Sequence, residues 1–289
     1  MDSKPDSGTS GLLWAAALLA LVGGAAGTPL SAQEPGTVVA ADSRVQGRSY
    51  LFEETGVEVP YALFVPTTYD ASRESPLVVA LHGLGRPYDW MMGYEGFIDF
   101  AEHHGFIVVA PLGYHPRGWY GSRGAGIPGG AVAAGQEGTV PENLGELSER
   151  DVMNVLEIAR DEFSVDSDRI YLWGHSMGGA GAYHLAARFP EIWAGVAVAA
   201  PAPRSDALAE IERFRELPVL VLHGDADATV PVEQSRAWVA RMGELGMQHV
   251  YIEFAGGDHS LFMRENPDNL SKVFSFFDVV RKDQRPAAR

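Results

Sequence analysis

A serine flanked by glycines is the first group in the chain that could carry out chemistry. It lies in the segment Gly174-His175-Ser176-Met177-Gly178. Residues 169–173 before it have strand character, and the small residues of 178–188 are typical of a helix packed closely on a sheet. Without a Cβ, the two glycines allow a sharp strand-to-helix turn that exposes the serine hydroxyl above the helix N-terminus. Ser176 is therefore the candidate nucleophile.

A serine hydroxyl needs a base, and the base needs a carboxylate that orients it. At this kind of turn the acid and then the histidine follow the serine along the chain. Asp227 lies in the loop after the apolar run 217–223, just before the short stretch that starts the next helix, and Asp225 in the same loop is the alternative. His259 lies in the loop after the run 249–254, where Asp258 is expected to shape the turn. We predict Asp227 as the orienting acid and His259 as the base.

The negative oxygen that forms during attack on a carbonyl needs N–H donors. One is expected from Met177, directly after the nucleophile, and one from the loop after the third strand. That loop reads His82-Gly83-Leu84-Gly85, and its glycines free the backbone to turn its amides inward. Leu84 is the predicted second donor, with Gly83 as the alternative. His82 precedes this turn, so we expect it to brace the loop rather than to act as the base.

Aromatic residues gather in the loops expected around this site. Tyr88, Trp90, Trp119 and Tyr120 are predicted to bind an apolar or aromatic part of a substrate, and packing within the loops is the alternative interpretation. The segment 121–138 is rich in Gly and Ala, which is consistent with a mobile rim or with an insertion. Phe262, near the predicted base, belongs to the same aromatic group.

Hydrophobic periodicity supplies the elements that must position these residues. Two alternating segments, 48–54 and 59–65, precede a succession of apolar runs and helical segments. The expected buried strands are 76–82, 106–111, 169–173, 193–199, 217–223 and 249–254, and the expected helices are 97–104, 148–163, 178–188, 208–216, 232–245 and 269–281. This order predicts an α/β fold with a mostly parallel eight-stranded sheet and helices on both faces. Ligands of such sheets bind beyond the carboxyl ends of the strands, where the candidate residues fall.

Composition limits the class of protein further. The chain has 289 residues, of which 46% are hydrophobic, so one large domain can account for it. Its formal net charge of -16 argues against a nucleic-acid partner, because binding phosphates needs a basic surface. The chain has no cysteine, so disulfides and thiolate metal sites are excluded. Five His and Asp side chains in the last loops could resemble a metal site, but without Cys or an H-E-x-x-H motif we expect no metal and no cofactor.

The N-terminus has the pattern of an export signal. Residues 12–22 are apolar over a length typical of a signal peptide, and small residues follow. We therefore expect 1–32 to be a signal peptide with its flank, 33–47 a flexible lead-in and 48–289 the catalytic domain. This organisation predicts a secreted or periplasmic protein, with no stable membrane insertion of the mature chain.

Taken together, these motifs resemble those of the α/β-hydrolase superfamily. They are Gly174 to Gly179, His82 to Gly85, His223-Gly224 with Asp227 and Val230-Pro231, and Asp258-His259. The chain is similar to secreted feruloyl esterases and polyhydroxybutyrate depolymerases, and also to prolyl-oligopeptidase-like hydrolases. Members of the esterase group often carry cysteines, which this chain lacks. The resemblance implies a serine hydrolase that cleaves small-molecule or polymeric carboxylic esters through an acyl-enzyme intermediate. A peptidase or amidase with the same triad, and a secreted binding module without activity, are the alternatives.

Overall fold

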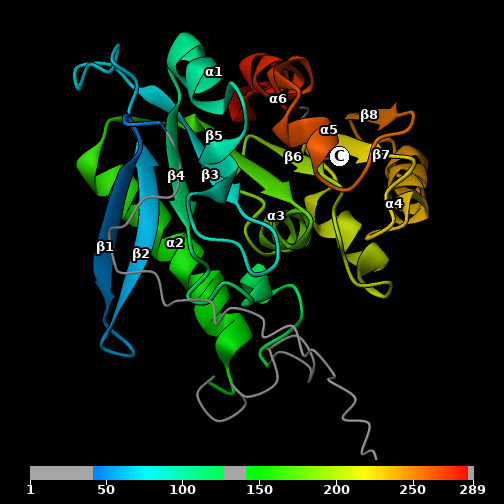
Figure 1. The fold of residues 1–289 in the computed structure, drawn as a ribbon, viewed down its shortest axis with the longest axis horizontal. Coiled ribbons are helices and arrows are strands. Elements are labelled where there is room, and N and C mark those ends of the chain that lie inside the picture. The colour runs from blue at the N-terminus through cyan, green and yellow to red at the C-terminus, as the bar shows by residue number, and fades with distance from the viewer. Residues whose placement is uncertain (1–41, 127–140, 286–289) are drawn as a thin grey trace, which may run out of the picture. The chain divides into compact units, whose positions relative to one another are not determined.

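A single sheet of eight strands organises the computed structural model, which describes residues 42–126 and 141–285 (Figure 1). The strands lie in the order β1-β2-β4-β3-β5-β6-β7-β8. Their bounds are β1 Gln46–Phe52, β2 Val57–Phe64, β3 Ser75–Leu81, β4 Ile107–Pro111, β5 Val165–His175, β6 Gly195–Ala199, β7 Val219–Gly224 and β8 His249–Phe254. The β1–β2 and β2–β4 pairs are antiparallel and all other pairs are parallel, which confirms the predicted fold class.

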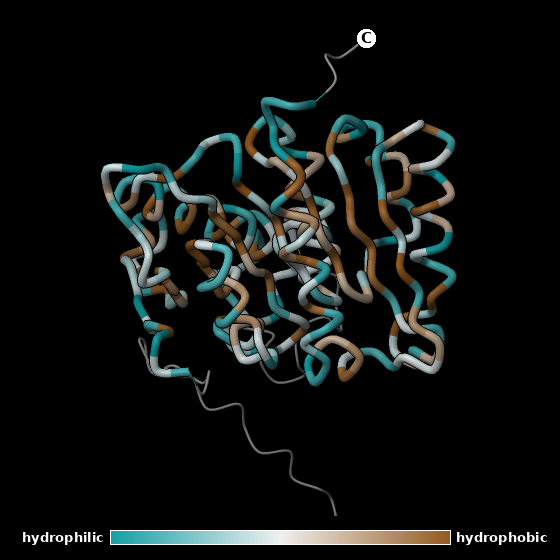
Figure 2. Tube along the Cα trace, turned by 90° about the horizontal axis from the view of Figure 1, so that it is seen from above, coloured by the Kyte–Doolittle hydropathy of each residue, from teal (hydrophilic) through white to brown (hydrophobic). Residues whose placement is uncertain are grey.

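Two hydrophobic clusters cover the two faces of the sheet. Side chains of β3 alternate between them, with Leu77, Val79 and Leu81 in one cluster and Val78 and Ala80 in the other. This is the two-residue period of a strand that is buried on both faces. In Figure 2 the hydrophobic stretches accordingly run through the interior, while hydrophilic colours dominate the periphery.

The helices divide between these two clusters. Residues of α2 (Leu144–Glu162), α3 (Met177–Arg188), α4 (Val232–Glu244) and the 3-10 helix η3 (Ala207–Phe214) belong to the first cluster. Residues of α1 (Phe97–His104) and α6 (Pro267–Val279) belong to the second. Shorter turns complete the set, namely η1 Trp90–Gly93, η2 Trp119–Gly121, α5 Leu261–Arg264 and η4 Lys282–Gln284. No helix within 42–126 or 141–285 is long and apolar enough to cross a membrane.

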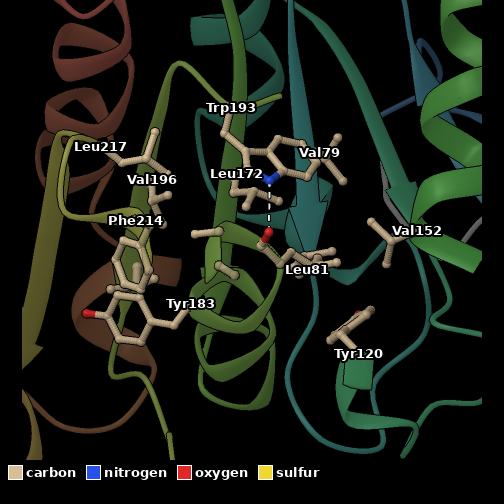
Figure 3. Close-up of a cluster of buried hydrophobic side chains, with 14 of the residues drawn as sticks. Val79, Leu81, Tyr120, Val152, Leu172, Tyr183, Trp193, Val196, Phe214 and Leu217 are labelled. Carbon is tan, nitrogen blue, oxygen red and sulfur yellow. Dashed lines mark hydrogen bonds between the residues drawn. The ribbon is translucent and has the colours of Figure 1, made fainter. Parts of the chain in front are cut away.

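Aromatic side chains fix α3 against the sheet. Tyr183 of α3 stacks on Trp238 of α4, with ring centroids 4.2 Å apart. Trp193 donates its indole N–H to the carbonyl of Leu185 at 3.1 Å and packs beside Leu172 of β5 (Figure 3). Because α3 begins directly after Ser176, this packing also fixes the direction from which the serine emerges.

Several element bounds differ from the predicted ones. The sheet begins at Gln46, inside the predicted lead-in, while residues 1–41 lie outside the described part of the chain. Helix α2 begins at Leu144 rather than at residue 148, so Ser148 lies within the helix. The Ser148 hydroxyl accepts the N–H of Tyr120 at 2.9 Å. The segment predicted as the helix 208–216 is a 3-10 helix. Residues 127–140 of the predicted rim also lie outside the described residues.

Candidate active site

The turn between β5 and α3 places Ser176 in a strained conformation, with φ 57° and ψ -114°. Neighbouring backbone is so close that only glycine fits on either side. A Cβ at Gly174 would lie 2.2 Å from the carbonyl oxygen of Gly178, and a Cβ at Gly178 would lie 2.0 Å from that of Leu81. The close approach of Gly178 to Leu81 shows that the turn packs directly against the end of β3, where the predicted oxyanion loop begins. Strain of this kind costs on the order of 1–3 kcal/mol and is characteristic of functional sites.

A chain of hydrogen bonds joins the three side chains that the sequence singled out. The Ser176 hydroxyl lies 2.9 Å from Nε2 of His259, and Nδ1 of His259 lies 2.7 Å from Oδ2 of Asp227. The three residues follow β5, β8 and β7, whose parallel carboxyl ends meet at one edge of the sheet. With Nδ1–H donated to the carboxylate, Nε2 is free to accept the serine proton.

Asp227 is held as an ionised carboxylate. Burial raises the pKa of its carboxyl, but hydrogen bonds from His259 and from the N–H groups of Val230 and Thr229 outweigh that effect and hold the pKa below its usual range. The two backbone donors lie 2.9 and 2.8 Å from Oδ1. Asp225, the alternative acid, accepts the N–H of Gly256 at 2.6 Å instead. The structure therefore places Asp227, and not Asp225, against the histidine.

A second histidine, His223, also contacts Asp227. Its Nε2 lies 3.1 Å from Oδ2 of Asp227 and 3.0 Å from the carbonyl of Val230, and its Nδ1 lies 2.7 Å from the Ser235 hydroxyl. Burial lowers the pKa of His223, so the ring is neutral, donates through Nε2–H and accepts from Ser235. The described residues hold no group of three or more His, Asp or Glu side chains arranged for a metal ion.

His175, beside the nucleophile, anchors the backbone of His259. Its Nε2 lies 2.7 Å from the His259 carbonyl, and its Nδ1 is hydrogen-bonded to the hydroxyl of Tyr94. Burial lowers the pKa of His175 to about 3, so the ring stays neutral and its Nε2–H donates to that carbonyl. Trp90 stacks on the same ring, with centroids 5.3 Å apart. The ring lies beside that of His259, with centroids 5.2 Å apart, and supports the candidate base through its backbone.

The loops that carry Asp227 and His259 pack against each other through glycine. A Cβ at Gly224 would lie 2.2 Å from the carbonyl oxygen of Gly257, and that same oxygen accepts the N–H of Ala226 at 2.9 Å. Asp258 turns the chain after this contact, because its carboxylate accepts the N–H groups of Ser260 and Leu261 at 3.1 and 2.7 Å. The position of Asp227 relative to His259 therefore depends on direct contact between two backbone segments.

The two predicted oxyanion donors lie on segments that touch. Met177 is the first residue of α3, where backbone N–H groups have no acceptor within the helix. In the loop with Leu84, the N–H of Gly85 donates to Pro116 at 2.8 Å. Nδ1 of His82 lies 2.8 Å from the carbonyl of Gly83, and its Nε2 lies 2.9 Å from that of Leu112. His82 thus braces this loop, as the sequence predicted.

The predicted substrate-binding role is wrong for two of the four aromatic residues. Tyr88 and Tyr120 are 1% and 0% exposed, so neither ring presents a surface to a substrate. Tyr120 packs in the core beside Val152, and its hydroxyl accepts the N–H of His82 at 3.0 Å (Figure 3). Sequence alone did not reveal this burial, because the phenol finds a polar partner inside the protein. Trp90 and Trp119 are partly exposed and remain candidates.

The sheet order and the strained serine turn define a protein of the α/β-hydrolase type. The chain belongs to the Esterase family, whose model matches residues 53–278. This membership confirms the esterase resemblance that the motifs predicted.

Individual relatives and a solved structure agree with this family. The chain is 28% identical over 172 residues to the S-formylglutathione hydrolase of Bos taurus, which covers 54% of this chain and 57% of the relative. It is 26% identical over 148 residues to feruloyl esterase B of Thermothelomyces thermophilus, covering 51% and 45%. The matches therefore span about half the length of these relatives. A ferulic acid esterase structure from Anaeromyces mucronatus has the same fold, with a TM-score of 0.60 at 17% identity over 86% of this chain and 95% of that one.

Proposed function

We propose that the protein is a serine hydrolase of carboxylic esters that uses Ser176, His259 and Asp227 as its catalytic triad. The observation that carries this proposal is the continuous hydrogen-bonded chain from the Ser176 hydroxyl through His259 to an ionised Asp227. Membership of the Esterase family supports the ester as the bond that is cleaved.

In the proposed reaction Ser176 Oγ attacks the ester carbonyl carbon while Nε2 of His259 takes the hydroxyl proton. Asp227 stabilises the imidazolium that results. The N–H groups of Met177 and Leu84 receive the negative oxygen of the tetrahedral intermediate. His259 then gives its proton to the leaving alcohol, and an acyl-enzyme remains. Water, deprotonated by His259, attacks this acyl group, and the acid leaves as Ser176 recovers its proton.

The proposed substrates are small-molecule or polymeric esters with an apolar or aromatic part. Trp90 and Trp119 are partly exposed, and Trp90 stacks on His175 beside the nucleophile, so these two residues are the proposed contacts for such a part. We further propose that residues 1–32 direct export, so that the enzyme meets its substrate outside the cytoplasm. Their apolar run is too short for a comfortable membrane span.

The test compares Ser176→Ala with Ser275→Ala, a matched change at an exposed serine of α6. On a panel of p-nitrophenyl esters, kcat of the first variant should fall by at least about 10³-fold and that of the second should not change. A fluorophosphonate probe should label Ser176 in the wild-type protein. Near-full activity of Ser176→Ala, or labelling of another residue, would overturn the proposal. Faster cleavage of peptide amides than of esters would favour the peptidase alternative.

A further inference from the structure

In this strongly acidic protein, four arginines that have no acidic partner within residues 42–126 and 141–285 lie in or next to loops that contribute to the site. The formal net charge is -16, and most arginines of the described residues have a carboxylate within 4.0 Å. In the same part of the chain, the arginines without such a partner are Arg86, Arg117, Arg123, Arg213, Arg264 and Arg285. Only Arg213 and Arg285 lie on elements away from the site. The positive charge of the remaining four opposes the repulsion that a protein of this net charge exerts on anions.

Arg86 and Arg264 approach the site from two different loops. Arg86 lies two residues after Leu84, and Arg264 ends the short helix that follows His259. Their guanidinium carbons lie 5.3 and 5.8 Å from the centroid of the Trp90 ring, so both cations meet at one indole. Trp90 in turn stacks on His175, directly beside the nucleophile.

These two side chains keep their hydrogen-bonding capacity unused. Within residues 42–126 and 141–285, neither guanidinium donates a hydrogen bond, although Glu265 is adjacent in sequence to Arg264. Arg123, in contrast, donates to the carbonyl of Ala202 at 3.3 Å and lies 3.9 Å above the Trp119 ring. Contact with an aromatic face satisfies none of the five N–H donors of a guanidinium. The Arg117 guanidinium likewise donates no hydrogen bond within the described residues, but only those of Arg86 and Arg264 meet at one ring, so these two are the pair best placed to bind a ligand.

We propose that Arg86 and Arg264 form an anion subsite at the mouth of the active site, so that the preferred substrates are esters that carry a carboxylate close to the scissile bond. This inference rests on the proposed ester hydrolysis. A guanidinium binds a carboxylate through two parallel N–H donors, which a point charge cannot reproduce. The carboxylate can belong to the acyl part, as in half-esters of dicarboxylic acids, or to the alcohol part, as in acyl esters of hydroxy acids. In both cases the guanidinium groups recognise the same group, a carboxylate.

The experiment uses matched pairs of esters. For the acyl side, mono-p-nitrophenyl glutarate is compared with p-nitrophenyl valerate. For the alcohol side, acetylated glycolate is compared with acetylated glycolamide, whose neutral amide replaces the carboxylate. The wild-type protein should prefer the anionic member of at least one pair by about tenfold or more in kcat/KM. Arg86→Gln and Arg264→Gln should each remove about tenfold of that preference, mainly through KM, and should leave the neutral esters within about twofold.

Two further variants separate recognition from structural support. Arg213→Gln removes an exposed, unpaired arginine of η3 and should change neither member of a pair. Arg86→Lys keeps the charge but loses the planar fork, so it should recover only part of the preference. High salt should weaken the preference of the wild-type protein in the same direction. Equal losses on charged and neutral esters would mean that the arginines only support Trp90, and would overturn the subsite.

The two proposals fail in distinguishable ways. If hydrolysis depends on Ser176 but shows no anion preference on either side, the subsite is wrong and the proposed function stands. If no ester is hydrolysed, the proposed function is wrong, and calorimetric titration with glutarate still decides the subsite. Binding of glutarate that is lost in the Arg86→Gln, Arg264→Gln double variant would support it, and no binding to the wild-type protein would overturn it.

Discussion

The contact between Gly224 and Gly257 predicts a large effect from a single methyl group. In Gly224→Ala the new Cβ would lie 2.2 Å from the Gly257 carbonyl oxygen, whereas ordinary contact begins at 3.4 Å. The two loops must then separate by about 1.2 Å, the shortfall between those distances. Because one loop carries Asp227 and the other His259, the displacement falls on their 2.7 Å hydrogen bond. A misplacement of about 1 Å can cost about 10²-fold in rate, which is the fall in kcat/KM that we expect.

The same variant should unfold more easily, but only moderately. Forcing one extra methyl group into a packed contact typically costs about 1–3 kcal/mol of unfolding free energy. Gly224 lies within β7 and has no positive φ, so alanine is compatible with its backbone conformation and the steric effect is isolated. The assay is kcat/KM on p-nitrophenyl acetate together with urea unfolding of the same preparation.

Gly243→Ala is the matched control for this prediction. Gly243 lies within α4, and the nearest atom to its added Cβ, on His249, is 4.0 Å away. This variant should keep full activity and gain about 0.5–1 kcal/mol of stability, because alanine is the better helix former. Activity of Gly224→Ala within twofold of the wild-type value would refute the view that loop contact sets the geometry of the site.

Two further predictions concern buried polar groups. Tyr94→Phe removes the hydroxyl that is bonded to Nδ1 of His175 and leaves this buried acceptor unpaired. The variant should lower the unfolding free energy by about 1–3 kcal/mol and kcat/KM by about tenfold. Unchanged urea unfolding and unchanged kinetics would contradict this prediction. Burial raises the pKa of the Asp151 carboxyl from 3.8 to about 6, so the folded state favours its protonated form. The contribution of this protonated group to the unfolding free energy is fully present below its unfolded pKa of 3.8 and is lost as the pH rises through 6. The unfolding free energy of the wild-type protein should therefore fall by about 2 kcal/mol relative to Asp151→Asn between pH 4 and 7. Parallel pH profiles of the two proteins would contradict this prediction.

The sequence predicted the parts of the site that depend on local pattern and strand order. Ser176 lies in a turn whose glycines follow from backbone contact, and Asp227 and His259 follow strands whose order fixes where they meet. The burial of Tyr88 and Tyr120 could not be predicted in this way, because a polar aromatic residue in a loop has the same sequence pattern whether it faces solvent or core. The contact of Ser148 with Tyr120 depends likewise on a helix that starts one turn earlier than its polar pattern indicates.

Buried neutral histidines play a part that no single motif revealed. His82, His175 and His223 lie at the ends of β3, β5 and β7, and each has a ring nitrogen within 2.7–3.0 Å of a backbone carbonyl in the loops of the site. Burial lowers the pKa of all three, so they hold these loops without adding positive charge. His259, in contrast, is partly exposed and contacts both a carboxylate and the serine. Among these four rings, only that of His259 combines access to solvent with contacts to both Asp227 and Ser176, so the proposed proton transfer falls on His259.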